Sequence, residues 1–99
     1  MKTSFTARHF KASQELQKYS VDSLQKLDQF YSRITACDIV LDRVADDESP
    51  FQAEVKCEIP GTLLNAKEKG DSYEQAVNMV VENVSRQLKK YKNKHFVNH

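Results

Sequence analysis

The chain has 99 residues, of which 39% are hydrophobic and 29% charged, and it contains two Gly and two Pro. This composition is typical of one folded domain and excludes a disordered or fibrous chain. The net charge of +1 conceals an asymmetry, because the last fifteen residues carry five of the fifteen basic residues and none of the fourteen acidic ones.

Membrane insertion and disulfide chemistry are not expected from this sequence. No apolar run approaches the roughly 20 residues of a spanning helix, and the first residues lack the apolar core of a signal peptide. We therefore expect a cytoplasmic protein without a membrane partner. Cys37 and Cys57 are too few for a disulfide framework or a zinc site, and they are predicted to be reduced, buried thiols.

The first part of the chain predicts a strand followed by a helix. The residues from Lys2 to Arg8 alternate in character, which is typical of a strand with one buried face. Ser13 supplies a hydroxyl of the kind that caps a helix N-terminus. The helix is expected to run to about Phe30, with an inward stripe at spacings of three and four residues: Leu16, Ser20, Leu24, Leu27 and Tyr31.

A hairpin is predicted next, because the hydrophobic period changes to two. Alternation over 37–42 and 51–59 indicates two strands. Symmetric closure of their connection places Arg43 opposite Phe51 and Cys37 opposite Cys57. The acidic residues of the connection, Asp46, Asp47 and Glu48, lack EF-hand spacing and are predicted to form a solvated turn instead of a calcium site.

The remaining residues predict a fourth strand and a long second helix. A turn at Pro60 and Gly61 precedes a strand over 63–69, and Asp71 with Glu74 is expected to start the helix. The inward face of this helix comprises Tyr73, Val77, Val80, Val84, Leu88 and Tyr91.

The order β-α-β-β-β-α predicts a single α+β domain over residues 1–99. We expect a four-stranded mixed sheet with two helices packed on one face, since each helix has one apolar stripe. The first two strands should be parallel and the others an antiparallel meander, with a frayed tail from about residue 95.

The main candidate site is a basic ridge on the last helix, which comprises Arg86, Lys89, Lys90, Lys92 and Lys94. At about 100° per residue the first three point away from the apolar stripe, and the last two flank them. Cations on a rigid element suit RNA phosphates, because each neutralised phosphate releases a counterion. The alternative is that these cations only complement the helix dipole and solvate the helix end. The absence of acids within the ridge favours polyanion binding, since a solvated helix usually mixes charges.

Four other basic residues, Arg8, His9, Lys26 and Arg33, extend this surface only if the fold brings them near the last helix. Taken singly, each is more typical of an ordinary surface residue. Enzymatic chemistry is not indicated, because the chain has no phosphate-binding loop, helical His pair or nucleophile elbow. His9, His95 and His99 are scattered, so no metal, catalytic residue, cofactor or small-molecule substrate is expected.

Several segments, in this order and spacing, carry a family resemblance over nearly the whole length. They are KLDQFYSRI at 26–34, Pro60 and Gly61, Leu64 and Ala66, Tyr73, and RQLKKYKNK at 86–94. On a β-α-β-β-β-α chain of this size, they make the sequence similar to the ribosome hibernation promoting factors, a family that includes the ribosome-associated translation inhibitor. Without a second domain or a C-terminal extension, the chain resembles the short promoting branch.

The resemblance implies binding to the small ribosomal subunit, through its 16S rRNA, in the channel for mRNA and tRNA anticodon stems. Idle ribosomes would then be held inactive during stress or stationary phase, and the free protein is expected to be a monomer. The basic ridge matches the family's basic last helix, and Lys26, Arg33, Arg8 and His9 match its other basic positions. Two alternatives stay open: a general double-stranded or structured RNA binder, and a domain that pairs with another protein through the solvated sheet face.

Overall fold

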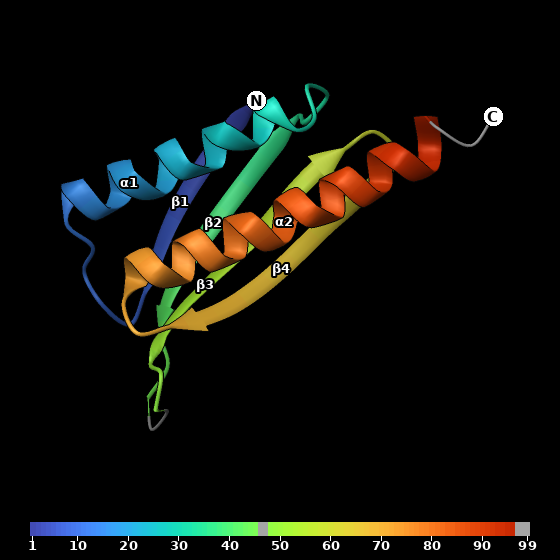
Figure 1. The fold of residues 1–99 in the computed structure, drawn as a ribbon. Coiled ribbons are helices and arrows are strands. Elements are labelled where there is room, and N and C mark those ends of the chain that lie inside the picture. Colours follow the sequence, from blue (N-terminus) through green and yellow to red (C-terminus); the bar gives the residue numbers. More distant parts are fainter. Residues whose placement is uncertain (46–47, 97–99) are drawn as a thin grey trace.

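A computed structural model describes residues 1–45 and 48–96. Figure 1 shows two helices lying side by side across one face of a four-stranded sheet, as the sequence predicted. The elements are β1 (Lys2–Arg8), α1 (Gln14–Gln25), a 3-10 turn η1 (Lys26–Gln29), β2 (Ala36–Arg43), β3 (Phe51–Ile59), β4 (Thr62–Gly70) and α2 (Tyr73–Phe96).

The sheet has the strand order β1-β2-β3-β4, with β1 parallel to β2 and the other pairs antiparallel. The predicted hairpin register is confirmed, since Arg43 pairs with Phe51 and Cys37 with Cys57. The core lies between the sheet and the helices, and its largest fully buried side chains include Ile39, Leu41, Val55, Leu24, Val80 and Leu88. The opposite sheet face is left to solvent.

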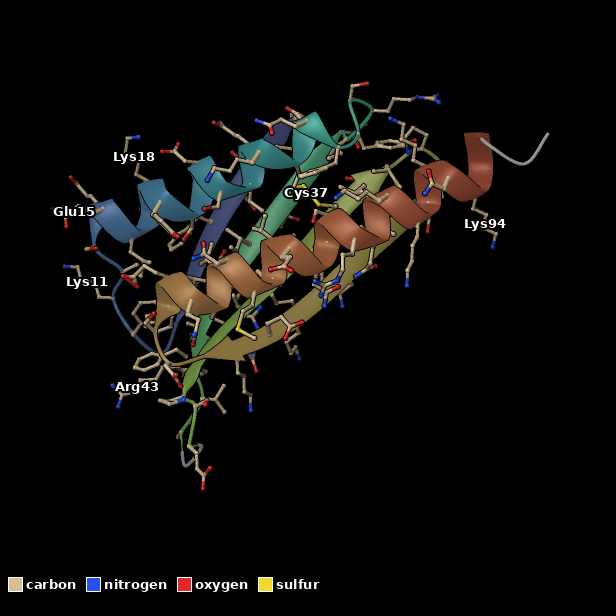
Figure 2. All side chains as sticks on the ribbon, in the orientation of Figure 1. Lys11, Glu15, Lys18, Cys37, Arg43 and Lys94 are labelled. Atoms are coloured by element: carbon tan, nitrogen blue, oxygen red, sulfur yellow. A yellow bond between two sulfur atoms is a disulfide. The ribbon has the colours of Figure 1, made fainter. Side chains whose placement is uncertain are left out.

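The two cysteines form a disulfide, so the prediction of reduced thiols is wrong, although both are fully buried as expected. Their Cα atoms are 4.4 Å apart, the spacing of a directly opposed antiparallel pair and one that a disulfide can bridge. Cysteine count and cellular compartment favour reduced thiols, but the strand register brings the two sulfur atoms together. Figure 2 shows Cys37 between the sheet and the helices.

The helix ends agree only in part with the sequence prediction. Ser13 caps α1, because its Oγ accepts a hydrogen bond from the Leu16 N–H at 3.1 Å. The α-helix ends at Gln25, earlier than predicted, and the tighter turn η1 follows it. The cap of α2 is Ser72 instead of Asp71, since the Gln75 N–H donates to the Ser72 hydroxyl at 3.0 Å. Serine at this position satisfies a free N–H directly.

Two other predictions fall partly outside the described residues. Helix α2 includes residues 95 and 96, where a frayed tail was expected, and residues 97–99 are not described. Asp46 and Asp47 of the predicted acidic turn are also outside the described residues. In the part of the chain that the structure describes, neither helix is long and apolar enough to span a bilayer.

Candidate nucleic-acid interface

All five residues of the basic ridge have exposed side chains, as predicted. Burial of Val84 and Leu88 against the sheet fixes α2, so the ridge stands on a rigid support. Arg86 donates a hydrogen bond to Glu82 at 2.9 Å, but both side chains are more than half exposed. A pair this exposed contributes little to stability and can be broken at low cost by a stronger partner.

The fold brings Lys26 and Arg33 beside the ridge, although they come from the other half of the chain. Arg33 and Lys92 line the same hollow of about 290 Å³. Lys26 lines a second hollow of about 240 Å³, between η1 and α2. Lys89 places its Nζ atom 4.8 Å from the centroid of the Phe30 ring. The two predicted positions therefore do extend the basic surface.

Phe30 lines both hollows and lies at the centre of this cluster. We call Phe30 with Lys26, Arg33, Lys89 and Lys92 the Phe30 basic surface. Leu27 and Tyr31 are buried on either side of it in sequence, and the Phe30 N–H donates to the Leu27 carbonyl at 3.0 Å. This anchoring leaves the Phe30 ring partly exposed at the surface.

Phe30 is not among the predicted site residues, because the sequence pattern places it at the end of a helix. The signal that could have found it is the interleaving of cations with an aromatic residue at Lys26, Phe30 and Arg33. Such interleaving is common in proteins that bind nucleic-acid bases together with their phosphates.

The ridge does not form one continuous face. On the β4 side of α2, the Gln87 amide donates to the Asn65 carbonyl at 3.1 Å, and the Asn83 amide donates to Glu68 at 2.8 Å. The helical period places Lys90 and Lys94 toward this side, while Lys89 and Lys92 face η1. Figure 2 shows Lys94 near the C-terminal end of α2.

Arg8 and His9 lie at the opposite end of the molecule, so the structure does not join them to the ridge. Phe10 stacks on Tyr73, the first residue of α2, with 4.2 Å between ring centroids. At about 1.5 Å per residue, Lys89 is about 24 Å farther along that helix. Arg8 is exposed on the helix-free sheet face, in a hollow that also contains Asp38, Glu54 and Lys56.

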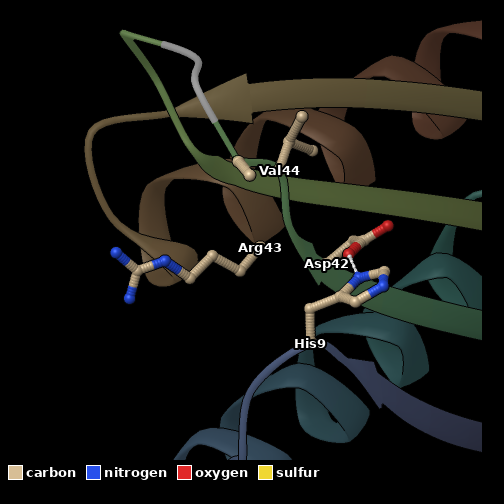
Figure 3. A pocket seen from close by; sticks show the side chains of 5 residues that line it. His9, Asp42, Arg43 and Val44 are labelled. Carbon is tan, nitrogen blue, oxygen red and sulfur yellow. Dashed lines mark hydrogen bonds and ion pairs between the residues drawn. The ribbon is translucent and has the colours of Figure 1, made fainter.

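Figure 3 shows that His9 faces Asp42, with 2.7 Å between its Nδ1 atom and a carboxylate oxygen. The hollow there has a volume of about 450 Å³ and is lined by His9, Asp42, Arg43, Val44 and Ala45. Nearby, burial raises the pKa of Tyr73, and no described residue forms a hydrogen bond with its buried hydroxyl. The hollow beside His9 contains the carboxylate of Asp42 as well as the guanidinium of Arg43. This mixture of charges makes the hollow a poorer polyanion site than the Phe30 basic surface.

Among the side chains described, those of residues 1–45 and 48–94, no three His, Cys, Asp or Glu residues lie close enough together to hold a metal ion. What the fold and the surface define is a small α+β domain that displays cations around a partly exposed aromatic ring. RNA-binding proteins use this combination of groups.

Residues 3–95 match the family model described as Sigma 54 modulation protein / S30EA ribosomal protein. The chain therefore belongs to this family, in agreement with the resemblance noted in the sequence.

Individual relatives are distant but cover nearly the whole chain. A ribosome hibernation promoting factor from Pseudomonas putida is 22% identical over 94 residues, which are 95% of this chain and 89% of the relative. The N-terminal domain of Thermus thermophilus Protein Y has a TM-score of 0.79 at 21% identity, covering 92% of this chain and 99% of that one. A ribosomal subunit interface protein from Coxiella burnetii has a TM-score of 0.82 at 20% identity, covering 93% and 98%. At these identities the structural likeness supports the fold alone.

Proposed function

We propose that this protein is a ribosome hibernation factor that binds the small ribosomal subunit. On this proposal it occupies the channel for mRNA and tRNA and represses translation during stress or stationary phase. It acts in the cytoplasm as a monomer when off the ribosome, by binding instead of catalysis, and uses no cofactor. The observation that carries the proposal is the convergence of residues 26–33 and the end of α2 into the Phe30 basic surface.

The charge distribution supports RNA as the ligand. The Phe30 basic surface and the rest of the ridge provide seven cations, namely Lys26, Arg33, Arg86, Lys89, Lys90, Lys92 and Lys94. The hollows contain two carboxylates, those of Asp28 and Glu82. This excess of positive charge attracts phosphates at long range, and contact with them releases counterions.

The shape of the site favours folded RNA. The cations stand on two segments that are packed against a common core, so little ordering is needed on binding. Long side chains on such a support can contact the backbone of a preformed RNA surface without reading base sequence. The names of the P. putida and C. burnetii relatives, which refer to ribosome hibernation and the ribosomal subunit interface, point to the ribosome as the source of that RNA.

The proposal is tested by co-sedimentation of the purified protein with isolated small ribosomal subunits across a salt series, with duplex RNA as the comparison. Saturable binding to subunits, weakened by salt and not matched by the duplex, is the expected result. Equal binding to both would indicate a general RNA binder. No binding to either would leave the ridge as a solvated helix end.

The effect on translation is measured separately in a cell-free reaction that starts from idle ribosomes. Addition of the protein before the mRNA should reduce synthesis, and a large excess of mRNA should partly restore it if both occupy the same channel. Inhibition that no amount of mRNA changes would contradict occlusion of the channel.

A further inference from the structure

We propose that Phe30 is a stacking platform for an unpaired base of the small-subunit rRNA, with Lys26 on one side and Arg33 with Lys92 on the other to hold the adjacent phosphates. This inference rests on the proposed function. The inference adds a stacking contact between Phe30 and a base to the contacts between cations and phosphates, and those charge contacts do not require an aromatic ring.

The position of the ring is the first argument. Phe30 separates two hollows of about 240 and 290 Å³, each with at least one cation on its wall. Its backbone is held by the bond to Leu27, and the next residue, Tyr31, is 5% exposed and packs edge-on against Tyr91 at 6.0 Å between centroids. The backbone of Phe30 is thus held in place while its side chain stays partly exposed between the two hollows, as a stacking platform requires.

The groups beside the ring are the second argument. The larger hollow contains Asp28 and Gln29 in addition to Arg33 and Lys92. A carboxylate can accept and an amide can both donate and accept hydrogen bonds at a base edge. The two cations suit the phosphates that flank the base. One hollow therefore provides partners for both parts of a nucleotide.

The contact between Lys89 and Phe30 is the third argument, because a cation–π contact is weaker than the stacking of a base on the same ring. An exposed cation–π contact changes an equilibrium constant by about two- to fivefold. Stacking of a base on an aromatic side chain contributes about five- to 150-fold. An arriving base therefore displaces the ammonium group of Lys89, which lies 4.8 Å from the ring centroid in the free protein. The released Lys89 then becomes available to a phosphate.

The competing explanation is that Phe30 only covers the core between η1 and α2, and that Lys89 packs on it by chance. The variants Phe30→Leu and Phe30→Tyr separate the two explanations, because leucine keeps an apolar side chain without an aromatic face and tyrosine keeps the face. Phe10→Leu is the matched control, since Phe10 is also a partly buried ring in contact with another group, Tyr73, at the far end of α2.

Binding to small subunits is measured at fixed salt for each variant, with circular dichroism to verify folding. We expect Phe30→Leu to weaken binding about tenfold, and Phe30→Tyr and Phe10→Leu to bind like the unaltered protein. If Phe30→Leu binds normally while Arg33→Gln with Lys92→Gln binds weakly, the stacking proposal is overturned and the proposed function stands. If neither variant binds more weakly, the Phe30 basic surface is not the binding face and the stacking proposal is overturned with it. The proposed function itself fails only if the unaltered protein does not bind small subunits.

Photocrosslinking provides a second test that does not depend on affinity. Ultraviolet irradiation of the protein bound to small subunits should join a stacked ring to its base. Digestion with trypsin should then give a peptide of residues 27–33 with a nucleotide attached at Phe30. The same peptide should carry no nucleotide in Phe30→Leu. If the peptide from the unaltered, fully bound protein also carries no nucleotide, the proposal is overturned.

Discussion

Replacing both Arg33 and Lys92 with glutamine, which removes two positive charges, should reduce the salt dependence of binding to the small subunit. These two cations line one hollow although they come from opposite halves of the chain. The slope of log affinity against log salt changes by about 0.7 to 0.9 for each phosphate contact. Two lost contacts therefore reduce the magnitude of the slope by about 1.6. When salt rises from about 50 to 200 mM, the ratio of the affinity of the unaltered protein to that of the double variant should then fall by about tenfold.

The assay is co-sedimentation or fluorescence anisotropy with labelled protein at four salt concentrations, for Arg33→Gln combined with Lys92→Gln. The control is Lys56→Gln combined with Lys67→Gln, which removes the same charge from exposed positions on β3 and β4. The control should keep the slope of the unaltered protein. Equal slopes for the two double variants would refute the reasoning, because only overall charge would then matter.

Three further predictions concern stability. Ser13→Ala removes the acceptor of the Leu16 N–H and should lower the free energy of unfolding by about 1 kcal/mol in urea titrations; an unchanged midpoint would argue against this cap. Reduction of the disulfide between Cys37 and Cys57, twenty residues apart, should lower the free energy of unfolding by about 3 kcal/mol. Urea unfolding curves that superimpose for the oxidised and reduced protein would show that the bond adds no constraint. Because burial raises the pKa of Tyr73, the folded state holds that proton more tightly, so stability should fall as pH rises past the unfolded value of about 10. Tyr73→Phe should lessen this fall, and an identical pH profile would contradict it.

The sequence by itself determined the elements and most of their pairing. Hydrophobic periods of two and of three to four residues are local properties, and they placed β1 and β3 at their observed bounds. The register that opposes Cys37 and Cys57 also followed, because the length of the hairpin connection allows one symmetric closure. The exposure of Arg86, Lys89 and Lys90 followed from the helical period.

Local details that depend on competing hydrogen bonds did not follow from the sequence. Asp71 and Ser72 are both good capping residues. Ser72 directly precedes the first residue of α2, and its hydroxyl accepts the hydrogen bond from the Gln75 N–H. Helix α1 ends at Gln25, where the turn η1 begins, and Leu27 within that turn and Tyr31 just after it are buried in the core.

Only the tertiary structure decided which basic residues belong together. Arg8, His9, Lys26 and Arg33 look equivalent as cations in a sequence, and their distance from α2 depends on how the helices lie on the sheet. The parallel arrangement of α1 and α2 puts the end of α1 beside Lys89 and Lys92, while β1 delivers Arg8 and His9 to the start of α2. Phe30 became a candidate for the same reason, because packing of the two helices sets which aromatic ring stays at the surface among cations.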